Sequence, residues 1–178
     1  MTEDDIGRSD DEDIEEPIDD KPSLELLSLL PDPDAMPVKD YLRAMGIFCI
    51  QMHNHLHPDE IAQIIPTFCS QKFHCQALHP EHASMRATSL KEYLSNVKYF
   101  RKKHPNYHVA AKNLTVHLDE ELGEATLIAT METHGLLGAD DLVRQSVYMG
   151  HWRRRKETGQ WYAQKLEIIR GPGSEPTF

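Results

Sequence analysis

Histidine is the residue of this sequence best suited to chemistry at neutral pH, and the chain carries eleven of them. An imidazole titrates close to physiological pH, so it can take up or return a proton beside a carbonyl group. His108 lies in a segment whose alternating pattern predicts a strand, on the face that also carries Leu114 and Val116. This position favours a histidine that lines a pocket. The alternative is a core histidine bonded to the backbone.

Three further histidines lie beside apolar residues. His151 shares a predicted strand face with Val147 and Met149, which places it either in the same pocket or in the packing of the sheet. His53 lies on the flank of a helical apolar stripe, and its alternative is a position in solvent. Strand alternation puts His134 on the face opposite its apolar neighbours. It therefore reaches a cavity only through a β-bulge, and is otherwise a loop histidine.

Two other kinds of site are weakly indicated. Cys69, Cys75, His79 and His82 are of the residue types that bind zinc. The two cysteines are separated by more than the usual spacing of about two to four residues, so we expect no metal. The basic run 153–156 is typical of a solvated hairpin end in a domain of balanced charge. We therefore expect no nucleic-acid partner.

The candidate histidines must be positioned by secondary-structure elements, and the first part of the chain is predicted to be mainly helical. Apolar residues at spacings of three and four predict three helices, over residues 38–55, 58–66 and 90–103. Ser89 with Glu92 three residues later is a capping-box pattern, which predicts where the third helix begins. The short apolar run 23–30 predicts a turn of helix that docks on the domain.

From residue 107 the apolar period changes to two, which predicts strands over 107–118 and 124–134. The stretch 144–170 then predicts a long hairpin that turns at Gly159. A short strand around 73–77 precedes them. This order predicts an α+β fold, a curved antiparallel sheet with helices packed on its concave face. The aromatic residues expected on the convex face are Tyr148, Trp152 and Tyr162.

Acidic residues are concentrated at the start of the chain. The first 20 residues carry a charge of −10, which equals the net charge of the whole chain, so the remainder is balanced. We expect an acidic, largely disordered tail and linker over 1–37, one domain over 38–170, and a short tail over 171–178. Three cysteines without a signal-peptide pattern indicate reduced thiols in a cytoplasmic or nuclear protein. No apolar run is long enough to span a membrane.

Several local patterns resemble the nuclear transport factor 2-like superfamily and its SnoaL-like domains. They are Asp40-Tyr41-Leu42 in the first helix, Ile65-Pro66-Thr67 after the second, and Trp152 and Trp161 on either side of the last turn. Within the superfamily, the chain is most similar to the fungal scytalone dehydratases. The resemblance covers residues 38–170 and implies a cone-shaped fold with three helices on the concave face of the sheet.

The dehydratase resemblance also implies roles for particular residues. Its two catalytic histidines fall on His108 and His134, in Asn106-Tyr107-His108-Val109 and Glu132-Thr133-His134-Gly135. We expect ligand-binding roles for His53, His74, Val147, Met149, His151 and Trp161. Of these, the resemblance carries family positions onto His53, Val147 and Met149, with His74 as the nearest polar candidate for a fourth. The family's carboxylate and tyrosines at these positions are replaced, which disfavours dehydration itself. The resemblance implies no cofactor, an apolar small-molecule ligand, and a homodimer or homotrimer formed through the sheet.

Two functions follow from these observations. The first is a small enzyme of secondary metabolism that acts by histidine proton transfer, of the dehydratase, cyclase or isomerase type, on an apolar cyclic, polyketide-like molecule. The second is a non-catalytic module of the same fold that binds a ligand or another protein. Whether His108 and His134 converge on one cavity is the feature that separates the two.

Overall fold

The computed structural model describes residues 21–78, 80–136 and 143–171 of the 178-residue chain. The acidic segment 1–20 and the tail 172–178 lie outside the described residues. Four α-helices, two 3₁₀ turns and five strands follow one another in the order α1 (Leu24–Leu27), α2 (Val38–His55), α3 (Pro58–Ile64), η1 (Ile65–Thr67), β1 (Cys69–Ala77), η2 (Pro80–Met85), α4 (Leu90–Lys103), β2 (His108–Asp119), β3 (Glu124–His134), β4 (Arg144–Arg154) and β5 (Trp161–Arg170). In the described part of the chain, no helix is long and apolar enough to cross a membrane.

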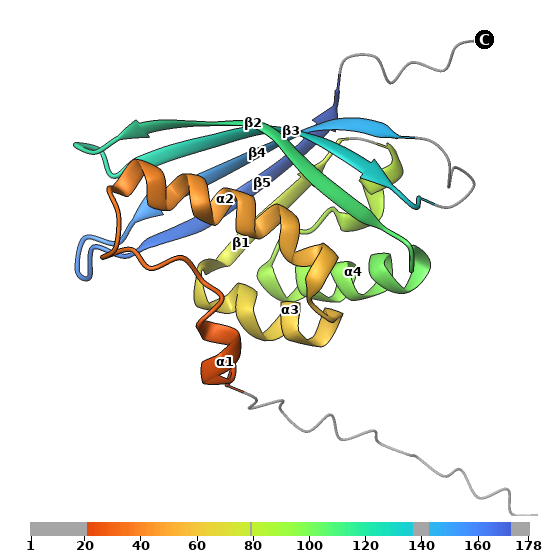
Figure 1. Cartoon of the computed structure of the whole chain (residues 1–178), viewed down its shortest axis with the longest axis horizontal. Helices are drawn as coiled ribbons and strands as arrows, with labels where there is room; N and C mark the ends of the chain where they lie inside the picture. The colour runs from red at the N-terminus through yellow and green to blue at the C-terminus, as the bar shows by residue number, and fades with distance from the viewer. Residues whose placement is uncertain (1–20, 79, 137–142, 172–178) are drawn as a thin grey trace, which may run out of the picture.

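The five strands form one curved sheet in the order β1-β5-β4-β3-β2, and the helices lie on one side of it (Figure 1). The predicted α+β class is confirmed, but the sheet is mixed rather than wholly antiparallel. Strands β2 to β5 are antiparallel to their neighbours, whereas β1 pairs with β5 in parallel. A parallel pair needs a long connection, and here everything from η2 to β4 separates the two strands. Apolar alternation does not encode strand direction, so the sequence pattern could not reveal this pairing.

Helix α2 lies close against the sheet because it carries a glycine at the contact. A Cβ atom on Gly46 would lie 2.7 Å from the side chain of Leu127 and 2.8 Å from that of Leu114. A larger residue would push the helix away from the sheet. On the same side of α2, Leu42 and Met45 are almost fully buried. The predicted apolar stripe is therefore the surface that contacts the inner face of the sheet.

The helix starts match the sequence signals. Ser89 is the N-cap of α4, and its hydroxyl accepts a hydrogen bond from the backbone N–H of Glu92 at 3.2 Å. The Glu92 carboxylate accepts from the backbone of Thr88 at 2.7 Å, one residue before the expected partner. The predicted turn of helix near residue 23 is α1. Its buried Leu26 joins the hydrophobic core, so packing on the domain begins before residue 38.

Side-chain alternation along β2 is interrupted by a β-bulge. Lys112 pairs with Thr130 and Thr115 pairs with Ile128, so β2 takes three steps where β3 takes two. Asn113 adopts a left-handed conformation there, with φ of 49°. Odd-numbered residues before the bulge and even-numbered residues after it therefore face the helices. The sequence analysis assumed unbroken alternation, and this bulge is why it assigned the first part of β2 to the wrong face.

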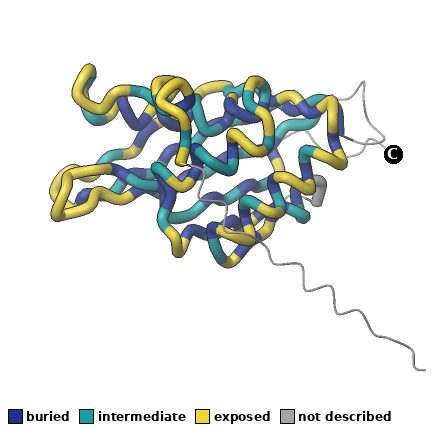
Figure 2. The backbone as a smooth tube through the Cα atoms, turned by 90° about the horizontal axis from the view of Figure 1, so that it is seen from below, coloured by how far each residue is buried: buried dark blue, intermediate teal, exposed yellow. Residues whose placement is uncertain are grey.

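A second irregularity lies between β4 and β5. His151 pairs with Lys165 and Trp152 with Ala163, which leaves Gln164 as the extra residue of β5. As a result, Trp161 and Ala163, which precede Gln164 in the strand, face the helices, and so do Leu166 and Ile168, which follow it. Figure 2 shows the resulting alternation of buried and less buried positions along the strands, with exposed residues concentrated in the turns.

The two faces of β4 are the reverse of the predicted ones. Tyr148 and Trp152, expected on the convex face, are 7% and 1% exposed and belong to the core. Val147, Met149 and His151 are half-buried on the outer face. Both faces of this strand carry apolar side chains, so alternation alone could not show which face is covered by the helices. The larger aromatic side chains bury more apolar surface and therefore occupy the covered face.

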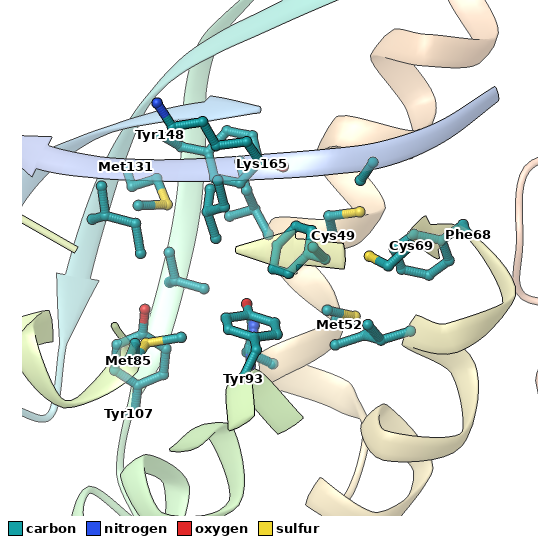
Figure 3. A pocket seen from close by; sticks show the side chains of 18 residues that line it. Cys49, Met52, Phe68, Cys69, Met85, Tyr93, Tyr107, Met131, Tyr148 and Lys165 are labelled. Carbon is teal, nitrogen blue, oxygen red and sulfur yellow. The ribbon is translucent and has the colours of Figure 1, made fainter. Parts of the chain in front are cut away.

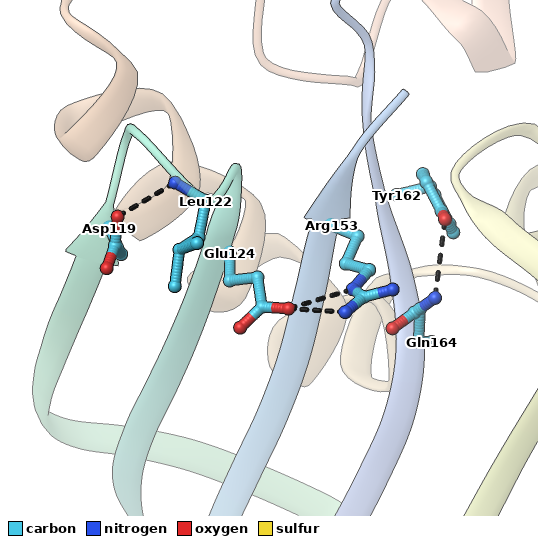
Figure 4. Close-up of polar contacts among 6 residues, drawn as sticks. All are labelled: Asp119, Leu122, Glu124, Arg153, Tyr162 and Gln164. Carbon is cyan, nitrogen blue, oxygen red and sulfur yellow. Dashed lines mark hydrogen bonds and ion pairs between the residues drawn. The ribbon is translucent and has the colours of Figure 1, made fainter. Parts of the chain in front are cut away.

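Polar contacts on the outer side tie the strand ends together (Figure 4). The Arg153 guanidinium of β4 pairs with the Glu124 carboxylate of β3. In the turn between β2 and β3, the backbone N–H of Leu122 donates to the Asp119 carboxylate at 2.9 Å. The groups are exposed, so these contacts stabilise the fold only weakly. The expected homo-oligomer through this face stays a prediction.

Asn113 offers a direct test of the bulge. We expect Asn113→Val to lower the free energy of unfolding by about 1–2 kcal/mol, because a β-branched residue is strained at positive φ. Asn113→Gly should cost much less, since glycine adopts this conformation freely. Urea denaturation measures both, with the exposed neighbour Lys112→Val as the control. Equal losses for the valine and glycine variants would contradict the bulge.

Candidate functional site

A cavity lies between the inner face of the sheet and the helices. Eighteen residues line it, and they come from α2, η1, β1, η2, α4 and strands β2 to β5, together with Phe68 and Tyr107 next to them (Figure 3). Its volume is about 50 Å³. One ordered water needs about 10–15 Å³ on this measure, so the cavity can take a few waters, or a small ring once flexible walls move. Met52, Met85 and Met131 supply such walls.

His53 is the imidazole of this cavity. It lies near the end of α2 and is 8% exposed. Its Nδ1 atom is buried and has no hydrogen-bond partner among the residues that the structure describes. Burial, together with the smaller effect of the nearby Arg101 guanidinium, lowers the pKa of His53 to about 4. The ring is therefore neutral at pH 7. An unpaired polar atom in a core costs about 1–3 kcal/mol, so a ligand that bonded it would recover free energy.

Three tyrosines surround the same space. Tyr93 comes from α4, Tyr107 from the residue just before β2, and Tyr148 from β4. The hydroxyls of Tyr93 and Tyr107 point into the cavity (Figure 3). Burial raises the pKa of all three phenols, so they are neutral hydrogen-bonding groups. Within the described residues, none of these hydroxyls has a hydrogen-bond partner, which leaves them available to a ligand.

Tyr148 depends on a neighbouring glycine for its position. A Cβ atom on Gly150 would lie 2.8 Å from the Tyr148 hydroxyl and 3.0 Å from the ring. The phenol therefore lies along β4 over the bare backbone of Gly150. Any other residue at this position would push the ring further into the cavity.

Two polar side chains outside the cavity hold the chain at residues 107–109. The Asn54 amide donates to the Val109 carbonyl at 2.6 Å and accepts from the Val109 N–H at 2.8 Å. Arg101 donates to the Tyr107 carbonyl at 2.9 Å, and its guanidinium lies 5.7 Å from the centre of the Tyr107 ring. Together they join α2 and α4 to the start of β2, so Tyr107 and Val109 line the cavity beside His53.

The cysteines of the cavity are unreactive. Cys49 and Cys69 both line it, and no disulfide joins them. Burial raises the pKa of Cys49 to about 12 and that of Cys69 well above its usual value, so neither is a thiolate at pH 7. Over residues 21–78, 80–136 and 143–171, no three side chains of metal-binding type come together. His79 of the weak zinc pattern lies outside the described residues.

His108 and His134 lie outside this cavity. They are cross-strand partners of β2 and β3 on the outer face, with ring centres 6.3 Å apart. His108 is exposed and His134 is half-buried, and neither lines the cavity. The bulge at Asn113 explains why His108 lies on the outer face, because it reverses the side of the sheet that the residues before it occupy. The two histidines do not converge on the cavity, so the expected catalytic roles of His108 and His134 find no support in its geometry.

The predicted ligand-binding residues divide in the same way. His53 lines the cavity as expected. Val147, Met149 and His151 lie on the outer face, where His151 Nε2 is 2.7 Å from the Glu167 carboxylate. His74 is half-buried and does not line the cavity. Trp161 is buried but also lies outside the lining, beneath the Arg154 guanidinium.

The sequence analysis missed most of the cavity's polar groups. Tyr107 was read as the start of a strand rather than as a cavity residue. Tyr93 lies within the predicted helix 90–103, for which the sequence indicated no functional residue. Tyr148 was placed on the wrong face. A usable signal existed for Tyr148, because a large aromatic residue two positions before Gly150 can lie over the glycine.

Comparisons with known proteins identify the fold. No family model and no curated protein matches the sequence. A nuclear transport factor 2-like protein with a cystatin-like fold from Novosphingobium aromaticivorans superposes with a TM-score of 0.58 at 13% identity, over 85% of this chain and 87% of that one. A provisionally assigned ketosteroid isomerase from Shewanella frigidimarina gives 0.53 at 11% identity, over 71% and 94%.

A provisionally assigned scytalone dehydratase from the same Novosphingobium species gives a TM-score of 0.52 at 12% identity, over 75% of this chain and 82% of that one. Similarity at such identities establishes the fold and not the activity. The chain therefore has the cystatin-like fold seen in the nuclear transport factor 2-like protein, as the sequence predicted.

Burial of His53 predicts a pH dependence of stability. The folded state holds the ring neutral down to about pH 4, whereas the unfolded chain binds a proton below its ordinary pKa near 6.5. Stability is therefore unaffected above about pH 7 and falls as the pH drops from 6.5 towards 4. We expect wild type to lose about 3 kcal/mol more than His53→Gln over this range, a figure taken from the size of the pKa shift.

Denaturant unfolding at several pH values measures this difference. The exposed His108→Gln variant is the matched control and should follow wild type. A parallel pH dependence for wild type and His53→Gln would show that His53 is not held neutral.

Proposed function

We propose that this cystatin-like cone binds a small apolar cyclic molecule that carries an oxygen function, and that His53 transfers a proton on it. The observation that carries the proposal is the buried, neutral imidazole of His53, whose Nδ1 atom has no hydrogen-bond partner among the described residues, in a cavity lined mainly by apolar side chains and phenols. Such pockets, mostly apolar with a few convergent polar groups, are typical small-molecule sites.

The chemistry that fits these groups is proton transfer next to a carbonyl. A neutral imidazole can remove a proton from the carbon beside a carbonyl, and a phenol can donate a hydrogen bond to the oxygen as negative charge develops there. Tyr93 and Tyr107 point their hydroxyls into the cavity with His53. A pKa of about 4 makes His53 a weak base in the empty cavity. The enolate formed beside it would stabilise the imidazolium and raise that pKa.

Returning the proton to another carbon completes an isomerisation. In a dehydration, the imidazolium instead gives the proton to a hydroxyl group on the neighbouring carbon, which leaves as water as the double bond forms. The similarity to structures assigned as a ketosteroid isomerase and a scytalone dehydratase supports these reaction types only at the level of the fold. Ketosteroid isomerases use a carboxylate base. No carboxylate occurs among the described residues that line this cavity, so the proposed base differs in kind.

Binding without catalysis is the second candidate. The weakness of His53 as a base and the missing carboxylate favour it. In that function the imidazole and the phenols only orient the ligand. The same cavity serves both candidates, so the experiment must measure binding and turnover separately.

The test uses 3-cyclohexen-1-one, a single-ring ketone whose isomerisation to the conjugated enone is followed by ultraviolet absorbance. We expect His53→Gln to reduce turnover by about 10²–10⁴ and to weaken binding far less, because the base is removed while the apolar walls remain. His108→Gln and His134→Gln are matched controls and should leave both quantities unchanged, since neither ring lines the cavity.

Binding that His53→Gln weakens, with no turnover by wild type, would establish the binding module and refute the proton transfer. A loss of turnover in His108→Gln but not in His53→Gln would place the chemistry on the outer face and contradict the proposed site.

A further inference from the structure

The cavity has no charge of its own to offer a ligand. Among the described residues that line it, Lys165 is the one Lys, Arg, Asp or Glu residue. Its ammonium lies 2.8 Å from one oxygen of Glu167, and the other oxygen of Glu167 is 2.7 Å from His151. Both partners belong to the outer face of the sheet. The ammonium is therefore paired on the side of the sheet away from the cavity, and Lys165 contributes no charge to the interior.

Every other ionisable group that lines the cavity is held neutral. Burial raises the pKa values of Cys49 and Cys69 and of the three tyrosines, and it lowers the pKa of His53. The Arg101 guanidinium does not line the cavity and lies over the ring of Tyr107. A charged ligand would lose its hydration and find no counter-charge in contact with it.

The lining also favours a particular kind of ligand. The hydroxyls of Tyr93 and Tyr107 point into the cavity, and sulfur lies on more than one side of it, since Met85 lies beside Tyr107 whereas Cys49 and Cys69 lie towards Phe68 (Figure 3). Thioether sulfur makes favourable contacts with aromatic rings, particularly at the ring edge. The methionines are thus suited to an unsaturated ring in the cavity, and the phenols to a single oxygen on that ring.

From this geometry we infer that the cavity selects an electrically neutral, single-ring, unsaturated ligand and rejects carboxylate and ammonium analogues of the same shape. The inference rests on the proposed function, in that it requires the cavity to be the ligand site. It narrows the ligand to compounds such as aromatic alcohols, phenols, amides or cyclic enones. Acids and amines that are ionised at pH 7 are excluded.

The test compares two pairs of probes that differ in charge but hardly in shape. Benzamide is paired with benzoate, and benzyl alcohol with benzylammonium. Dissociation constants at pH 7.5 come from ¹H–¹⁵N chemical-shift titration of the wild-type protein, which also locates each probe. We expect the neutral member of each pair to shift the amides of cavity residues such as Val109 and Ala163, and to bind at least about a hundredfold more tightly, given the cost of burying an unpaired charge.

The outcomes separate the two proposals. Equal affinities within each pair, with shifts at the cavity, would overturn the charge selection but leave the cavity as the binding site. Binding of neither member would overturn both. Shifts confined to outer-face residues such as Met149 and Glu167 would also overturn both, because the ligand would then lie on the other side of the sheet.

Discussion

The two hydrogen bonds between the Asn54 amide and the backbone of Val109 fix the relation between helix and sheet on which the cavity depends. Strand β2 is an edge strand, and a side-chain amide from α2 satisfies backbone groups that no neighbouring strand can reach. The clamp sets the end of α2 against the start of β2. His53, the residue before Asn54, then lies beside Tyr107, with ring centres 6.4 Å apart. Removing this contact would separate the two walls that carry the polar groups.

Desolvation gives the enclosed space its chemical character. The same burial that packs the helices on the sheet keeps His53 neutral and the phenols and thiols protonated. Ionised groups are paired on the outer face instead, as in the Glu124–Arg153 and Glu167–Lys165 contacts. The sheet therefore separates a charged, hydrated surface from an uncharged interior. The proposed chemistry and the proposed ligand class both follow from this separation.

More of the fold than of the candidate site could be predicted from the sequence. Helical spacing, the Ser89 cap and the change to a period of two gave the elements and their order, because each signal is local. Which face of a strand is covered is not local. The bulges at Asn113 and Gln164 each shift the alternation by one residue, which moved His108 to the outer face and kept both Ala163 and Leu166 inside. Tyr148 entered the cavity because burying a phenol outweighs burying Val147 or Met149. Which of these side chains is buried depends on the helices that cover the sheet, and a single strand does not reveal them. Of the two positions that helical spacing left open for His53, the structure has the one that lines the cavity.

Imidazole NMR of the selectively labelled wild-type protein shows whether His53 is the neutral histidine that meets the ligand. We expect the His53 ring to stay neutral until the pH approaches 4, and benzyl alcohol to shift its ring signals while leaving those of His108 unchanged. A His53 ring that titrates near its ordinary pKa of 6.5, or benzyl alcohol that shifts His108 and not His53, would contradict the account.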